Sequence, residues 1–106
     1  MSQSNACAVS ITTTLHAKPG WEDALARVLH TLAQIVRREE PGCLLYQPVH
    51  SRHHAARFML LERYRDESSL LAHANSAHFR DALAGLMECL ASPPDLAVYD
   101  ELGDAG

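Results

Sequence analysis

Four side chains in the second half of the chain have the right chemistry to move protons. Glu62 and Tyr64 alternate along one short segment, and His73 and His78 follow in a stretch with helical spacing. Imidazole titrates near neutral pH, so histidine is the commonest general base, and desolvation in an apolar cavity tunes it further. His73 is therefore the first candidate for a catalytic base, and His78 is the second.

Each of the four also has a structural interpretation. His73 precedes a helix break, where a histidine either points into a cavity or bonds a loop carbonyl. His78 lies in the first turn of the next helix, where the helix dipole favours an uncharged imidazole but partial exposure is equally common. Tyr64 could orient a substrate beside Glu62 on the same strand face, whereas an ion pair with an arginine is the commoner use of such a carboxylate.

Metal and thiol chemistry find less support in the sequence. Three histidines cluster near a turn without a carboxylate or cysteine at ligand spacing, namely His50, His53 and His54. The cysteines are odd in number and form no CxxC motif, so free thiols are expected at Cys7, Cys43 and Cys89. Without a Gly-rich phosphate loop or a complete ligand set, we expect no flavin, haem or metal cofactor.

The elements that must position these residues begin with a strand and a long helix. Apolar and polar residues alternate from Val9 to Ala17, which predicts a strand. Apolar residues at i, i+3, i+4 spacing predict a helix from roughly Trp21 to Arg38, with Trp21 packed on the sheet. Cys43 to His50 predicts a second strand, and Pro48 places it at a sheet edge because proline cannot donate a ladder hydrogen bond.

The second half of the chain continues with two strands and a broken helix. Arg57 to Arg65 predicts a strand with bulky residues on both faces. Asp66 is expected to cap a short helix, and Ser76 a longer one after a break near Asn75. The longer helix carries an apolar stripe of Phe79, Ala82, Leu83, Leu86, Met87 and Leu90. The last strand alternates through Leu96, Val98 and Leu102.

This β-α-β-β-α-β order predicts an α+β fold of the ferredoxin-like class. Right-handed crossovers give a four-stranded antiparallel sheet of order 4-1-3-2 with the helices on one face. One layer of helices leaves the apolar second face of the third strand uncovered. We therefore expect a homodimer through that face, with His16 at its seam, which makes a dimeric α+β barrel.

Length and charge narrow the function classes. The 106 residues suit one domain, assigned to residues 8–102, between an extended or disordered N-terminus of residues 1–7 and a tail of residues 103–106. The net charge of −4, with scattered Lys and Arg, disfavours nucleic acid and anionic membrane as partners. The first seven residues lack the apolar run of a secretory signal, so a cytoplasmic protein is expected.

Several short motifs together resemble a known family over about Val9 to Tyr99. They are Lys18-Pro19-Gly20, Pro41-Gly42-Cys43-Leu44 with Tyr46, Glu62-Arg63-Tyr64, and His73 followed by Ser76-Ala77-His78-Phe79. The chain is similar in these motifs to the antibiotic biosynthesis monooxygenases. That resemblance implies a dimeric ferredoxin-like domain that oxygenates a quinol or polyphenolic compound with molecular oxygen, without metal or flavin.

Two departures from the family pattern bear on the reaction. Tyr64 stands where many members carry Trp, which resembles the family's isomerase branch as much as its oxygenase branch. Haem-degrading members carry an Asn in the first strand and a His early in the last helix. Here the first strand offers Ser10, Thr12 and Thr14 instead, and Leu83 takes the helix position. Haem is therefore not expected.

The resulting hypothesis is a cofactor-independent monooxygenase with His73 as base and Tyr64 orienting the substrate. Cofactor-free oxygenation requires an electron-rich substrate anion, so the protein must hold and deprotonate a phenol or enol. Two alternatives stay open. One is an isomerase or tautomerase that removes a proton beside a carbonyl in the same cavity, and the other is a non-enzymatic dimer that binds a small ligand.

Overall fold

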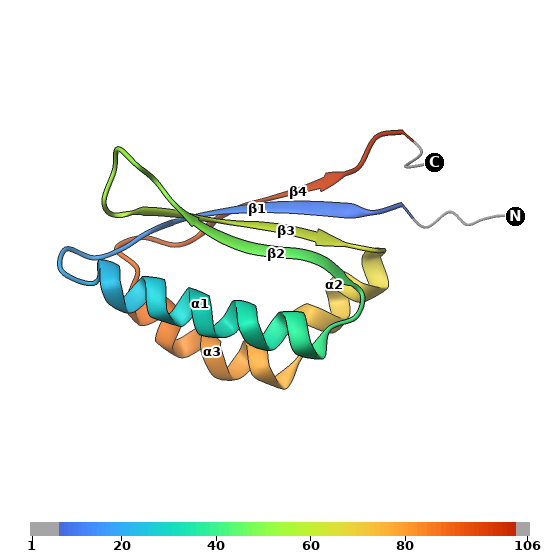
Figure 1. Ribbon diagram of the computed structural model, residues 1–106, viewed down its shortest axis with the longest axis horizontal. Helices are drawn as coiled ribbons and strands as arrows, with labels where there is room; N and C mark the ends of the chain where they lie inside the picture. The colour runs from blue at the N-terminus through green and yellow to red at the C-terminus, as the bar shows by residue number, and fades with distance from the viewer. Residues whose placement is uncertain (1–6, 104–106) are drawn as a thin grey trace, which may run out of the picture.

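The fold follows the predicted order, with the second helical region divided in two. The computed structural model describes residues 7–103, so most of both predicted tails lies outside the described residues. Along the chain the elements are β1 (Val9–His16), α1 (Glu22–Glu39), β2 (Cys43–His50), β3 (Arg57–Tyr64), α2 (Glu67–Ala74), α3 (Ala77–Glu88) and β4 (Asp95–Asp100). Figure 1 shows the sheet as one layer and the helices as a second layer beneath it.

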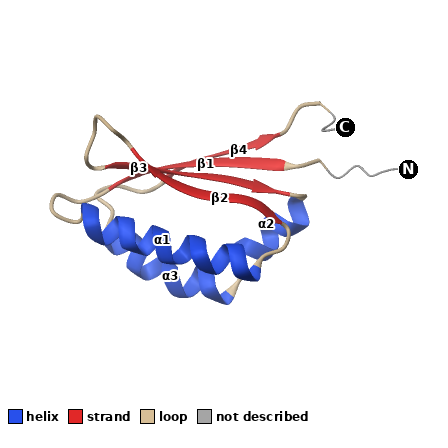
Figure 2. Ribbon diagram, in the orientation of Figure 1, coloured by secondary structure: helices blue, strands red, loops and turns tan. Residues whose placement is uncertain are grey.

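The antiparallel sheet has the order β2-β3-β1-β4, which confirms the predicted 4-1-3-2 order read in reverse. All helices of the described residues lie on the same side of it (Figure 2), and the opposite side, which none of them covers, is here called the open face. The pairing of Val9 with Tyr64 and of Ile11 with Glu62 turns these side chains toward the helices. The sheet therefore places both β3 site candidates in the helix-covered interior.

β2 is an edge strand, as Pro48 predicts, and it contains a bulge. Cys43 pairs with Tyr64 and Leu45 with the adjacent Arg63, so Leu44 is the extra residue. Without a bulge, Cys43 and Tyr46 would face opposite sides, because side chains alternate along a strand. The bulge brings Tyr46 opposite Glu62, on the face that the helices cover.

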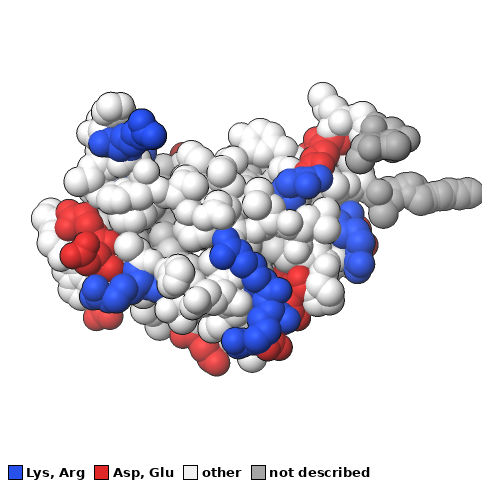
Figure 3. Space-filling view, viewed as in Figure 1, with Lys and Arg blue, Asp and Glu red and all other residues white. Residues whose placement is uncertain are grey.

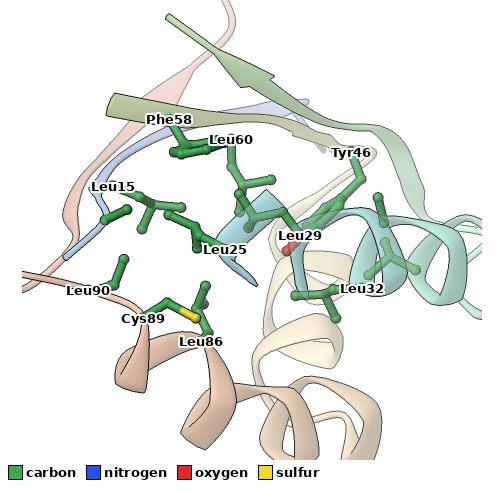
Figure 4. Packing of buried hydrophobic residues seen from close by; sticks show 13 residues of the cluster. Leu15, Leu25, Leu29, Leu32, Tyr46, Phe58, Leu60, Leu86, Cys89 and Leu90 are labelled. Atoms are coloured by element: carbon green, nitrogen blue, oxygen red, sulfur yellow. The ribbon is translucent and has the colours of Figure 1, made fainter. Parts of the chain in front are cut away.

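The main core lies between α1 and the sheet. Leu25, Leu29, Leu32 and Val36 recur at helical spacing and are at most 1% exposed. Figure 4 shows several of these leucines facing Leu15, Phe58 and Leu60 of the sheet, with Leu86 and Cys89 closing the cluster from the last helix. Burying a leucine of this kind contributes about 1.5–3 kcal/mol, so this cluster fixes α1 against the sheet.

Two side-chain caps define the short helices. The Asp66 carboxylate accepts a hydrogen bond from Ser69 N at 2.8 Å, and the Ser76 hydroxyl accepts one from Phe79 N at 3.2 Å. Both caps were predicted. Asn75 separates the helices, so the last turn of α2 and the first turn of α3 meet at a fixed junction.

Several predicted apolar positions are more exposed than the sequence pattern indicates. Leu83 and Met87 of α3 are 38% and 43% exposed, because α3 packs through a narrow face around Leu86. Trp21 does not pack on the sheet as predicted but lies at the surface under the Lys18 ammonium. Leu102 is 97% exposed, because β4 ends at Asp100.

The described surface mixes charges of both signs. Figure 3 shows acidic and basic side chains interspersed over the face that it presents. Within residues 7–103, the helices are too short or too polar to cross a membrane.

Leu86 and Leu83 form a matched pair for testing the packing of α3. Leu86→Ala should lower the free energy of unfolding by about 2–5 kcal/mol, because the truncated side chain leaves a cavity. Leu83→Ala should cost less than half as much, because that side chain already meets water. Urea denaturation measures both, and equal losses would show that Leu83 is covered in solution.

Candidate active site

The end of α1 supplies a carboxylate that the sequence analysis did not single out. Glu40 caps the helix, and its backbone N–H donates to Val36 O at 2.9 Å. The Pro41-Gly42 turn follows, closed by a bond from Cys43 N to Glu40 O. This closed turn keeps the Glu40 side chain directed into the interior, where the side chain is 10% exposed.

The α2–α3 junction aims two imidazoles at that carboxylate. The Ser76 hydroxyl donates to His73 O at 2.7 Å while it caps α3, which fixes the angle between the helices. His73 Nδ1 lies 2.8 Å from Glu40 Oε2, and His78 Nε2 bonds the same oxygen. A carboxylate only accepts hydrogen bonds, so the proton lies on Nδ1 of His73 and on Nε2 of His78.

Glu62 and Tyr64 form a second buried pair beside these histidines. The Tyr64 O–H donates to Glu62 Oε1 at 2.5 Å, within the range typical of a hydroxyl on a carboxylate. The Tyr64 ring lies 5.5 Å from the His73 ring, and the Tyr46 ring lies 5.4 Å from it. All four predicted site residues therefore belong to one cluster, which Glu40 and Tyr46 complete.

Burial dominates the electrostatics of this cluster. Desolvation raises the pKa of Glu62, and the Tyr64 O–H and then His73 partly offset that rise. Desolvation, reinforced by the Glu62 charge, also raises the pKa of both Tyr46 and Tyr64. The two phenols therefore stay protonated, and the Tyr64 phenol donates its hydrogen bond to Glu62.

A surface cleft reaches part of the cluster. It has a volume of about 360 Å³, and its wall includes Glu40, Cys43 and His78 with residues of the α2 N-terminus. Burial and the Glu40 charge raise the pKa of the Cys43 thiol to about 11, so it stays protonated at this wall. His73 and Tyr64 are 5% and 0% exposed. A small molecule in the cleft would therefore meet His78 and Glu40 first.

Gly42 allows α2 to approach this region closely. A Cβ on residue 42 would lie 2.7 Å from Ser69 Cβ, well inside van der Waals contact. Ser69 has little freedom to move, because its hydroxyl donates to the Asp66 carboxylate. The close approach seats the N-terminus of α2 against the turn that follows Glu40.

Residues 8–85 match the family described as antibiotic biosynthesis monooxygenase. The chain belongs to that family. Among curated proteins none matches the chain.

Solved structures of similar chains agree with the monooxygenase family assignment. A candidate antibiotic biosynthesis monooxygenase from Caulobacter crescentus is 26% identical, with a TM-score of 0.88 and 92% of each chain covered. A Pseudomonas aeruginosa protein is 29% identical, with a TM-score of 0.84, over 95% of this chain and 100% of its own. A family candidate from Nitrosomonas europaea, at 20% identity and a TM-score of 0.87 over 98% and 99% of the two chains, shares the fold.

The hairpin histidines lie apart from this cluster. His50 stacks on Phe58 with ring centroids 4.0 Å apart, and its Nε2 contacts Ala55 O. Within the described residues, the His and carboxylate side chains that converge are those of Glu40, His73 and His78. Glu62, for which the sequence analysis favoured an arginine partner, bonds Tyr64 instead.

Replacing Glu62 tests the electrostatics of the buried pair. Burial raises its folded pKa above the ordinary value of 4.5, so the stability linked to its proton is lost as pH rises through the folded pKa. Glu62→Gln keeps an acceptor for Tyr64 without the charge. It should raise the free energy of unfolding at pH 7, with a gain that shrinks toward pH 4.

Glu101→Gln is the control, because the pKa of Glu101 is shifted in the opposite direction and the expected change in stability has the opposite sign. Hydrogen bonds from Arg63 and Ser10 lower the pKa of Glu101 to about 2, so its contribution to stability is present at neutral pH and lost in acid. This variant should be less stable than the wild type at pH 7. Urea titrations across pH measure both, and a loss of stability at pH 7 in Glu62→Gln would contradict the burial argument.

Proposed function

We propose that this protein is a cofactor-independent monooxygenase that oxidises a small quinol or polyphenolic compound with molecular oxygen. The observation that carries the proposal is the Glu40 carboxylate shared by two imidazoles at the edge of a cleft. An imidazole that donates one N–H to a carboxylate keeps its other nitrogen as the proton acceptor. The family match supports an oxygenase in particular.

Each residue of the cluster then has a distinct role. His78 is the more exposed imidazole and takes the proton from a substrate hydroxyl in the cleft. Glu40 offsets the charge of the imidazolium that forms. His73, the first candidate from sequence, is buried and positions Glu40 by bonding the same carboxylate oxygen. Tyr64 and Glu62 form the buried pair beside it.

The proposed reaction balances without a further electron donor. Loss of the hydroxyl proton to His78 gives an electron-rich phenolate, which transfers an electron to O₂. Recombination of the radical pair forms a carbon–oxygen bond. Cleavage of the O–O bond then leaves one oxygen atom on the ring and releases the other as water, so a phenol and O₂ yield a quinone and H₂O. General-base assistance of this kind contributes about 10²- to 10⁴-fold.

We also propose that the working unit is a homodimer joined through the open face. Leu45, Val49 and Tyr99 are exposed on that face, and Met59 and Leu61 of β3 are only half-buried there. These apolar side chains lie on both sides of the polar residues Ser10, Thr12 and Thr14 of β1, and their exposure on one sheet face favours an interaction site there. A second copy supplies a complementary surface through twofold symmetry.

The assignment of His78 as the catalytic base is tested by measuring oxygen uptake with a panel of quinols and polyphenols. His78→Ala should lower turnover by about 10²-fold or more, the usual size of a general-base contribution. His53→Ala is the matched control, because that histidine is exposed at the hairpin, and it should keep full activity. Full activity in His78→Ala at normal stability would overturn the assignment.

The outcome with the wild type also separates the alternative functions. Product formation without oxygen uptake would favour an isomerase or tautomerase that uses the same base beside a carbonyl. Saturable binding without turnover across the panel would favour a ligand-binding module.

The dimer is tested by light scattering at micromolar concentration. The wild type should have twice the mass of one chain, and Leu61→Lys on β3 should shift it to a monomer because a buried unpaired charge is costly. Leu71→Lys is the control, since that leucine is exposed on α2. A wild type with the mass of one chain would contradict the proposed homodimer.

A further inference from the structure

The geometry points to a binding site for one divalent transition-metal ion, of the kind exemplified by zinc, formed by Glu40, His73 and His78. One ligand atom from each residue, two imidazole nitrogens and one carboxylate oxygen, lies within 4.8 Å of the other two. Two histidines and a glutamate are a ligand set that zinc uses at open sites. The sequence analysis did not predict it, because Glu40 was not among its candidates.

The ligand atoms lie close enough for one metal ion to reach all three after adjustment of the side chains. Ligand bonds of 2.0–2.2 Å at tetrahedral angles place neighbouring ligand atoms roughly 3.3 Å apart. Glu40 Oε1 already lies 3.1 Å from His73 Nδ1. Oε2 lies closer to both histidines because protons bridge these atoms. A metal ion would take the place of these bridging protons, because both histidines must be deprotonated at the ligating nitrogen.

Charge and burial also favour a cation at this point. The ligand groups of Glu40 and His73 are 10% and 6% exposed, so water screens a charge there weakly. Glu62 bonds Tyr64, whose ring lies 5.5 Å from the His73 ring, so a second carboxyl group lies near the site. A divalent ion would neutralise charge that the cluster otherwise carries in a desolvated place.

The backbone holds the ligands in advance. Ser76 ties the α2–α3 junction on which both histidines lie, and the closed turn after Glu40 holds the carboxylate. Such preorganisation raises metal affinity, because less side-chain freedom is lost on binding.

The cleft provides the entry path and room for a fourth ligand. Glu40 and His78 line it together with polar groups of Asp66, Ser69 and Ser76. A metal bound by three protein groups keeps a fourth position for water or a ligand atom. His78 is the most exposed of the three groups, which puts that position on the cleft side.

A metal ion would be bound by His78 through Nε2, the nitrogen that faces Glu40, whereas the proposed base is the other nitrogen of the same ring. If the proposed function holds, zinc is an inhibitor, because an imidazole bound to a cation accepts a proton poorly and because Glu40 can no longer offset the imidazolium charge. Binding itself does not depend on the oxygenase proposal, because the ligand set exists whatever the reaction is.

The experiment titrates the full-length protein, stripped of metal with a chelator, with Co²⁺ and then with Zn²⁺ as competitor. The wild type should show visible d–d absorption that saturates at one Co²⁺ per chain and disappears as Zn²⁺ displaces it. His78→Ala and Glu40→Gln should each weaken Co²⁺ binding by about 100-fold or more, beyond the loss typical of an outer-shell partner. Circular dichroism checks that the variants are folded, and His78→Gln serves if His78→Ala is not.

A double variant at the hairpin, His53→Ala with His54→Ala, is the matched control and should bind Co²⁺ like the wild type. Absence of saturable binding in the wild type up to millimolar Co²⁺, or equal binding by the wild type and the folded His78 variants, would overturn the proposal. Inhibition of oxygen uptake is scored separately. Binding without any turnover would therefore refute the proposed function and leave the metal site standing.

Discussion

Removal of the Glu40 carboxylate from water is the constraint on which this end of the molecule depends. A desolvated carboxylate costs several kcal/mol unless donors replace its hydration. Here the donors come from two helices 33 and 38 residues further along the chain. The end of α1, the break between α2 and α3, and the register of both histidines must therefore agree with one another.

The interior between the helices and the sheet has an apolar end and a polar end. Toward the start of α1, the space between helix and sheet is filled by leucines and Phe58 and is held by apolar burial. Toward the end of α1, the same layer contains Glu62, His73 and Tyr64, whose hydrogen bonds must all be satisfied at once. Apolar packing tolerates substitution of similar volume, whereas a buried polar network is sensitive to the loss of any member. One end of the domain supports the fold, and the other is committed to a specific arrangement of polar groups.

Much of the fold was predictable because its signals are local. Strand alternation, the caps at Asp66 and Ser76, and the edge position of Pro48 each depend on a few neighbouring residues. The four site candidates were also predictable, since their types and the family motifs are visible in the chain. Glu40 was not, because a glutamate beside Glu39 before Pro-Gly looks like a solvated helix end, and its partners are distant in sequence. The exposure of Leu83 was missed for a related reason, since periodicity shows a helix face but not how much of it finds a neighbour.

The bulge at Leu44 links the length of the chain to the composition of the interior wall. The extra residue sets which face of the sheet each later side chain of β2 points to. Loss of a single residue there would turn Tyr46 outward and bring its neighbours inward, without any change in residue type elsewhere. A change of one residue in the length of β2 at this position would thus alter which side chains meet His73 in the interior, while the helices and the remaining strands could stay as they are.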